Sequence, residues 1–120
     1  MCGRGGSIIN ISSSTVINGG PGVPHYVASK AAVVGLTRSL SRVLGDDGIR
    51  VNTLAPGRTA SETFVAHVGL DSFAANTALR SLKRIQHPED LVGAVVLLAS
   101  DDSALITGQM LVVDGGKDLH

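Results

Sequence analysis

The sequence predicts an α/β fold with three parallel strands connected by crossover helices. Three short apolar segments, at residues 7–12, 49–55 and 109–116, have the length and composition of strands. Segments with helical spacing lie between them, and this alternation is typical of a parallel sheet with helices on its faces. The apolar runs do not alternate cleanly with polar residues, so we expect each strand to be buried on both faces.

The first strand is predicted between a Gly-Gly pair and a run of serines. Residues 13–24 are rich in glycine and proline and are expected to form a loop. Pro24 stands where the first turn of a helix tolerates proline, and we expect a helix over residues 25–44 that ends at the Gly-Asp-Asp-Gly sequence. Its apolar stripe is predicted to consist of Val27, Ala31, Val34, Leu36, Leu40 and Val43.

The second strand, at residues 49–55, is broken by the following Pro-Gly pair. The next segment is more polar, with short helices expected at 62–68 and 71–81. The sequence His-Pro-Glu-Asp at 87–90 is a helix-start signal, because the helix dipole favours acidic residues in the first turn. We expect that helix to run to about residue 100 and to lead into the third strand.

Composition excludes several classes of function. The chain has 120 residues, enough for one domain, and its ten basic residues are scattered, so no nucleic-acid partner is expected. Neither an apolar run of membrane-spanning length nor a secretory signal is visible, so no membrane partner is expected. The single cysteine, Cys2, cannot form an internal disulfide and favours a reducing, cytoplasmic location. The four histidines lack metal-ligand spacing, so no metal site is expected.

Polar residues follow the predicted strands at their carboxyl ends, where ligands bind an open parallel sheet. The serines at 12–14, the pair Pro56 and Gly57, and the Asp-Gly-Gly sequence at 114–116 lie at these ends. Tyr26 and Lys30, at the start of the predicted long helix, are near the same edge. We therefore expect the functional site at this edge of the sheet.

Tyr26 and Lys30 are four residues apart and share one face of the helix. A nearby ammonium stabilises a phenolate, so a tyrosine in such a pair can transfer a proton near neutral pH. A hydroxyl at the end of the first strand, such as that of Ser13, can hold the same substrate oxygen by a hydrogen bond. The alternative is an ordinary helix with one aromatic residue and one charge, preceded by serines that form a turn.

The order of the segments is more specific than any one of them. The chain contains, in succession, a strand ending in serines, a glycine-rich loop, Tyr-Val-Ala-Ser-Lys, an Arg-Val-Asn strand ending in Pro-Gly, a Pro-Glu-Asp helix, Ile-Thr-Gly-Gln and Val-Asp-Gly-Gly. This series resembles the short-chain dehydrogenase/reductase family, in its classical branch of enzymes like the 3-oxoacyl-(acyl-carrier-protein) reductases. The resemblance covers nearly every residue from Gly5 to Gly116.

The resemblance implies an oxidoreductase that interconverts a small-molecule carbonyl and a secondary alcohol by hydride transfer, with NAD or NADP as cofactor. Tyr26 falls on the family's general acid/base, and Lys30 on the lysine that assists it and binds the nicotinamide ribose. Ser13 falls on the family's serine, with Ser12 and Ser14 as alternatives. Many members are homo-oligomers, so a homo-oligomer is expected here.

Further cofactor contacts are implied later in the chain. Pro56 and Gly57 match a turn whose backbone passes the nicotinamide ring, and a hydroxyl soon after that turn often holds the carboxamide. Thr59, Ser61 and Thr63 compete for that role, and Ser61 has the more usual offset.

Residues 58–84 correspond to the family's substrate-covering segment, whose contents choose the substrate. Its apolar residues either line a pocket or form the face by which the short helices pack against the rest of the chain. The sequence favours neither alternative. These residues are Phe64, Val65, Val68, Leu70 and Phe73.

The resemblance is confined to the C-terminal half of the family's Rossmann-type doubly wound sheet. The glycine-rich pyrophosphate turn is missing, because Gly3, Gly5 and Gly6 precede a strand and do not follow one. We therefore expect residues 1–120 to be a single partial domain whose first strand has an open edge. Such a chain alone is expected to be marginally stable and to bind cofactor weakly or not at all. The alternative to an oxidoreductase is a truncated, non-catalytic fragment that acts as a dimerising or binding module.

Overall fold

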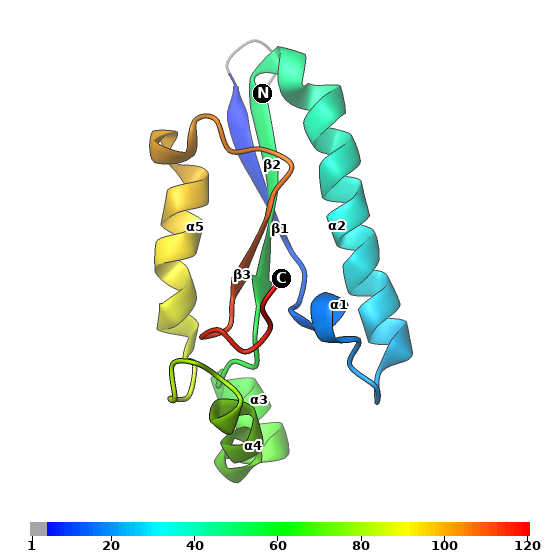
Figure 1. Cartoon of the computed structure of the whole chain (residues 1–120). Coiled ribbons are helices and arrows are strands. Elements are labelled where there is room, and N and C mark those ends of the chain that lie inside the picture. Colours follow the sequence, from blue (N-terminus) through cyan, green and yellow to red (C-terminus); the bar gives the residue numbers. More distant parts are fainter. Residues whose placement is uncertain (1–4) are drawn as a thin grey trace.

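The computed structural model describes residues 5–120, so Cys2 and Gly3 lie outside the described residues. The chain forms three layers (Figure 1). The sheet lies between helix α2 (Pro24–Leu44) on one face and helix α5 (Val92–Ala99) on the other.

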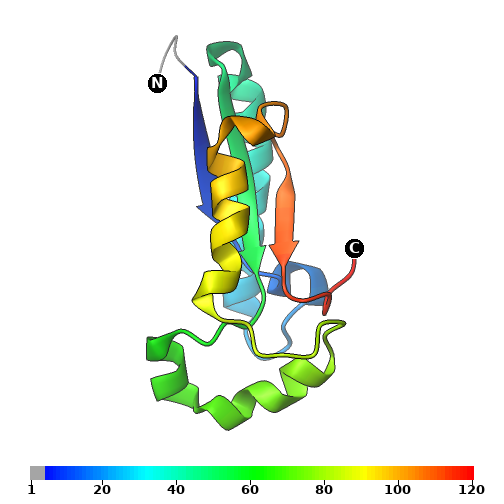
Figure 2. The same ribbon diagram turned by 90° about the vertical axis from the view of Figure 1, so that its left-hand side faces the viewer.

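The sheet consists of β1 (Gly6–Ile11), β2 (Ile49–Pro56) and β3 (Met110–Val113), in that order across the sheet. Both strand pairs are parallel. All three strands therefore place their carboxyl ends at the same edge, which is the lower edge in Figure 2. The predicted α/β fold with three parallel strands and helical crossovers is confirmed.

Burial differs among the strands. β2 is buried along most of its length, since it pairs on both sides, and Val51 and Ala55 have no exposed surface. β1 and β3 are only half-buried, and Ile11 at the end of β1 is 48% exposed. The expectation that every strand is buried on both faces is therefore wrong for β1 and β3. The reason is that, within residues 5–120, each of these strands pairs with a neighbour on one edge only.

Helix α2 begins at Pro24 and ends before Gly45, as predicted. Gly48 closes the turn after it with a φ of 71°, a left-handed conformation that glycine adopts without strain. The predicted apolar stripe is largely wrong, because Leu36 and Val43 are 54% and 68% exposed. Val34 is the one member of the stripe that is buried, together with Thr37.

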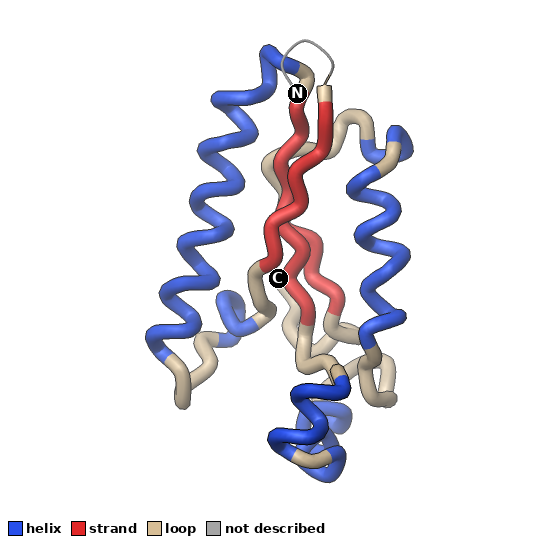
Figure 3. The backbone as a smooth tube through the Cα atoms, turned by 180° about the vertical axis from the view of Figure 1, so that it is seen from behind, coloured by secondary structure: helices blue, strands red, loops and turns tan. Residues whose placement is uncertain are grey.

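The connections contain short helical segments. The predicted loop at residues 13–24 holds a single helical turn, α1 (Thr15–Asn18), so the loop assignment is wrong there. The predicted helix at 71–81 is also too long, because that region has a 3₁₀ turn followed by α4 (Ala74–Ala78). Helix α3 (Glu62–Val68) has the predicted bounds, and both α3 and α4 lie beyond the strand ends (Figure 3). The 3₁₀ turns are Gly45–Asp47, Leu70–Phe73, Pro88–Leu91 and Asp101–Ser103.

No helix within residues 5–120 combines the length and the apolar character needed to cross a membrane.

Buried hydroxyl groups fix α2 against the sheet. Thr37 is 1% exposed, and its Oγ1 accepts hydrogen bonds from Thr53 Oγ1 at 2.7 Å and from Asn10 Nδ2 at 3.0 Å. Thr53 belongs to β2 and Asn10 to β1, so one helical side chain joins both strands. Because Tyr26 and Lys30 are on the same helix, this contact helps to set their position relative to the strand ends.

Replacing this hydroxyl should weaken the attachment of α2. In Thr37→Val the hydroxyl of Thr53 and the amide of Asn10 lose their common acceptor in a buried place. We expect the free energy of unfolding to fall by about 2 kcal/mol. Urea unfolding of the wild type and of each variant, prepared as the native protein that its source cells make and followed by circular dichroism, measures the change. Thr63→Val, at an exposed position, is the matched control, and equal stability of the two variants would contradict this role of Thr37.

Candidate active site

A cleft of about 620 Å³ opens at the carboxyl edge of the sheet. It is lined by the ends of β1 and β2, the first turns of α2, and the segment that carries α3 and α4. Six of the seven predicted site residues line it, namely Ser13, Tyr26, Lys30, Pro56, Gly57 and Thr59. Their proximity follows from the parallel sheet, which brings strand ends that are distant in sequence to one place.

Ser61 is the exception. Its side chain accepts a hydrogen bond from the backbone N–H of Phe64 at 3.3 Å and caps the start of α3. The N-cap is a position where a serine oxygen satisfies a free helical N–H. The structure therefore gives Ser61 a local structural partner outside the cleft, while Thr59 lies in the cleft lining.

Tyr26 and Lys30 lie in the first turns of α2, and both line the cleft; Tyr26 is 39% exposed. The Lys30 Nζ lies 5.8 Å from the centroid of the Tyr26 ring. The same nitrogen donates a hydrogen bond to the backbone carbonyl of Ile11 at 3.3 Å. The ammonium is thus held between the end of β1 and the face of the Tyr26 ring.

Ser12 and Ser13, the first two of the three serines after β1, have different hydrogen-bond partners. The Ser12 hydroxyl donates to the Lys30 carbonyl at 2.8 Å and so ties the strand end to α2. Ser13 Oγ accepts hydrogen bonds from the backbone N–H of Thr15 at 3.2 Å and from its hydroxyl at 3.0 Å. With its lone pairs used in this way, the Ser13 hydroxyl proton is available for a bond to a ligand oxygen in the cleft.

Thr59 is fixed by its neighbours. Its hydroxyl donates to the Gly57 carbonyl at 2.9 Å and accepts from Gln86 Nε2 at 3.2 Å. Gln86 is 4% exposed, and its Nε2 also donates to the carbonyl of Val113 at the end of β3. Gln86 therefore joins the turn after β2 to β3, and sequence reasoning missed it because a single glutamine outside any motif gives no signal.

Arg80 is a second residue that the sequence did not reveal. It is 1% exposed, and it donates to the carbonyl of Arg84 at 2.8 Å and to that of Arg58 at 2.7 Å. It thereby joins the two ends of the segment that carries α3 and α4. Burial lowers the pKa of the Arg80 guanidinium, and the nearby Asp114 carboxylate opposes that shift.

The turn at Gly57 is tightly packed against Asp114. A Cβ atom at position 57 would lie 2.6 Å from the Asp114 Cβ, so only glycine fits there. The Asp114 carboxylate accepts hydrogen bonds from the backbone N–H groups of Gly116, Lys117 and Asp118. The Asp-Gly-Gly sequence thus forms a turn that supports the Pro-Gly turn beside the cleft.

Arg84 and Asp90 form a two-pronged ion pair at the start of the segment leading to α5. The two terminal guanidinium nitrogens of Arg84 donate to the carboxylate, at 2.8 and 2.6 Å, and the backbone N–H of His87 donates to it at 2.8 Å. The hydrogen bonds from Arg84 and then from His87 hold the pKa of Asp90 well below its usual range. The same contact raises the pKa of Arg84.

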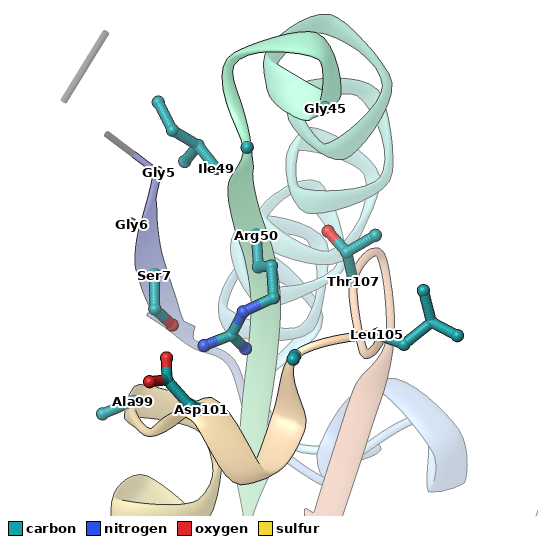
Figure 4. Close-up of a pocket in the computed structure, with 12 residues that line it drawn as sticks. Gly5, Gly6, Ser7, Gly45, Ile49, Arg50, Ala99, Asp101, Leu105 and Thr107 are labelled. Atoms are coloured by element: carbon teal, nitrogen blue, oxygen red, sulfur yellow. The ribbon is translucent and has the colours of Figure 1, made fainter. Parts of the chain in front are cut away.

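A second hollow, of about 410 Å³, lies at the opposite, amino end of the sheet (Figure 4). Arg50 extends into it from β2. Its guanidinium donates to the carbonyls of Leu98 and Ser100 and to the hydroxyl of Ser103. These bonds satisfy carbonyls at the end of α5, so the charge in this hollow has a structural role.

Among residues 5–120, no group of three or more His, Cys, Asp and Glu side chains is placed to hold a metal ion.

The comparisons with known proteins agree with this arrangement. A family model described as enoyl-(acyl carrier protein) reductase matches residues 1–118. A 3-oxoacyl-(acyl-carrier-protein) reductase of Chlamydia trachomatis is 42% identical over 115 residues, which are 94% of this chain and 45% of the relative. An L-rhamnose 1-dehydrogenase (NAD(P)+) of a Sphingomonas species is 40% identical over 120 residues, covering 95% of this chain and 45% of the relative.

Solved structures give the same result. The crystal structure of a 3-oxoacyl-(acyl-carrier-protein) reductase with bound NAD from Brucella melitensis superimposes with a TM-score of 0.84 at 33% identity. That match covers 95% of this chain and 41% of the Brucella chain. The fold is therefore of the Rossmann type, as the sequence predicts. The chain belongs to the short-chain dehydrogenase/reductase family. It spans less than half the length of the relatives that it matches.

Removing the Arg80 guanidinium should destabilise the attachment between the two ends of the segment that carries α3 and α4. Arg80→Met keeps an apolar stem but leaves the carbonyls of Arg58 and Arg84 without their donors. We expect the free energy of unfolding to fall by about 3 kcal/mol. Urea unfolding of the native protein checks this, with Arg42→Met at an exposed site of α2 as the control. A loss of stability no greater than that of the control would contradict this role of Arg80.

The Arg84–Asp90 pair should make stability depend on pH in acid. The folded pKa of Asp90 is below its ordinary value of 3.8, so its carboxylate stabilises the fold above that pH. This contribution is lost as the pH falls toward the folded pKa. Asp90→Asn should therefore be less stable than the wild type at pH 6, and the difference should shrink below about pH 4.

Thermal unfolding of both proteins between about pH 3 and pH 7 measures this difference. The exposed Asp71, changed to Asn, serves as the control. A gap between wild type and Asp90→Asn that stays constant across the whole pH range would contradict the assigned cause.

Proposed function

We propose that this chain forms the catalytic part of an NAD(P)-dependent oxidoreductase that interconverts a carbonyl and a secondary alcohol. The observation that carries the proposal is the convergence of Ser13, Tyr26 and Lys30 on one cleft at the carboxyl edge of the sheet. Support comes from relatives, since one is named for NAD(P)+ and a solved neighbour contains NAD.

In this proposal Tyr26 is the general acid/base. During reduction a hydride bonds to the carbonyl carbon, the C=O π bond breaks, and the Tyr26 hydroxyl gives its proton to the oxygen. Ser13 donates a hydrogen bond to the same oxygen and stabilises the charge that develops on it. Lys30 favours the phenolate that remains on Tyr26. In the oxidation direction the same groups act in reverse.

The donor set and the size of the cleft fit such a cofactor. A volume of about 620 Å³ is within the usual range of small-molecule sites, about 300–1,000 Å³. NADH or NADPH, when bound, supplies the hydride for reduction, and NAD+ or NADP+ accepts it in oxidation. In this proposal Lys30 binds a ribose hydroxyl, and the backbone at Pro56 and Gly57, with Thr59, holds the nicotinamide end.

We further propose that residues 1–120 are the C-terminal half of the Rossmann-type domain. The glycine-rich turn of a dinucleotide site does not follow β1, where serines and the turn α1 are found instead. Within residues 5–120, β1 also has one unpaired edge, which suits a strand whose other neighbour comes from additional sequence.

A homo-oligomer and a cytoplasmic location belong to the same proposal. The exposed apolar residues Leu36 and Val43 on α2 favour contact with another surface. The single cysteine favours a reducing compartment.

The second candidate is a non-catalytic module that dimerises or binds a full-length relative. The unpaired edge of β1 favours it, because a free parallel edge can accept another strand. Catalysis by the native protein distinguishes the two candidates, since such a module has none.

Tyr26→Phe tests the catalytic proposal. The variant keeps the ring and removes the hydroxyl, so we expect kcat/KM for carbonyl reduction to fall at least about a hundredfold with the fold intact. NADH or NADPH oxidation by the native protein, followed at 340 nm with a panel of ketones, is the assay. Ser39→Ala removes an exposed hydroxyl from the same helix and is the control. Full activity in Tyr26→Phe would refute the assignment of the general acid.

A further inference from the structure

The wall of the cleft formed by residues 58–76 is more polar than its sequence suggests. Of the five apolar residues considered for a pocket, Phe64 alone lines the cleft. Phe73 is 1% exposed and packs edge-to-face on Phe64, with ring centroids 5.8 Å apart. Leu70 is half exposed and does not line this cleft. Phe64 is therefore the one apolar side chain that this wall offers to a substrate.

Arg58 is the charged residue of this wall. Its guanidinium carbon lies 4.8 Å from the centroid of the Phe64 ring and 5.0 Å from that of Phe73. One of its nitrogens donates to Ser72 Oγ at 3.0 Å. Two aromatic contacts and one hydrogen bond hold the group in a fixed place, which reduces the entropy lost when it binds a partner.

No carboxylate within residues 5–120 forms an ion pair with Arg58. The cleft lining contains three cationic residues, Lys30, Arg58 and Lys117, and neither aspartate nor glutamate. Lys117 is paired with Asp118, and Lys30 is engaged with the end of β1. Among the described residues Arg58 is thus the cation in the cleft that has neither an ion-pair partner nor a role in the proposed mechanism, so its charge is available to a ligand.

Asn76 gives an independent indication of a polar ligand. It lines the same cleft, and its Oδ1 is buried without a hydrogen-bond partner among the described residues. A buried amide oxygen without a partner is unfavourable, and a hydroxyl or amide of a ligand would satisfy it.

We infer that Arg58 binds an anionic group of the substrate, so that the enzyme acts on small oxo or hydroxy acids in preference to neutral carbonyl compounds. This inference rests on the proposed oxidoreductase function and names its substrate class. A planar guanidinium binds a carboxylate or a phosphate through two parallel hydrogen bonds, which a neutral group cannot match. Asn76 accepts a hydrogen bond from a further polar group of the same substrate.

The test compares acids with their methyl esters. The native protein is assayed with 2-oxo, 3-oxo and 4-oxo acids of four to six carbons, each paired with its ester, which lacks only the charge. For at least one pair we expect kcat/KM to be about tenfold to a hundredfold higher for the acid. Arg58→Met, whose stem still covers the two rings, should abolish this preference, mainly by raising KM for the acid. Arg58→Lys should restore part of it, because it restores the charge.

Arg42→Met is the control, because it removes an exposed cation outside the cleft. An equal loss for acid and ester in Arg58→Met would mean that Arg58 only packs the segment, and a raised KM for NADH or NADPH would mean that it binds the cofactor. Either result overturns the inference, as does a wild type that prefers esters or reduces none of the acids. Reduction of esters or neutral ketones in those cases would leave the proposed function standing.

Discussion

The pairing of β2 with a parallel strand on each side is the constraint on which the rest of the structure depends. It makes β2 the buried centre, and its polar side chains are satisfied by defined partners. Asn52 donates to the carbonyl of Ile106 and accepts from the N–H of Gln109, while Thr53 bonds to α2 through Thr37. β2 thus holds the segment leading to β3 through Asn52, and it holds α2, the helix of Tyr26, through Thr53.

The same pairing brings the candidate site together. Parallel strands end at one edge, so the serines after β1, the Pro-Gly turn after β2 and the Asp-Gly-Gly turn after β3 are neighbours there. Arg80 and Gln86 then stiffen this edge, since each donates hydrogen bonds to other segments, and Asp114 orders the turn after β3. In the proposed mechanism the proton donor must be fixed relative to the substrate, and the Thr37 contacts hold the helix of Tyr26 against the sheet.

Much of this could be predicted from the sequence. The three parallel strands, the start of α2 and the gathering of Ser13, Tyr26 and Lys30 follow from apolar runs, Pro24 and the carboxyl-edge rule. The role of Ser61 could not be predicted, because a serine soon after a turn can cap a helix as readily as it can bind a ligand. Arg80 could not be found, because burial of an arginine depends on carbonyls brought near by the tertiary fold. The burial of β1 and of the α2 stripe was overestimated, because periodicity tells which residues share a face and not whether anything covers that face.

The most direct test is a crystal structure of the native protein with NADH or NADPH and an unreactive substrate analogue bound. The account predicts the nicotinamide ring beside Pro56 and Gly57, the Lys30 Nζ on a ribose hydroxyl, and the hydroxyls of Tyr26 and Ser13 both within about 3 Å of the analogue's oxygen. A nicotinamide bound elsewhere, or an oxygen out of reach of Tyr26, would contradict the account.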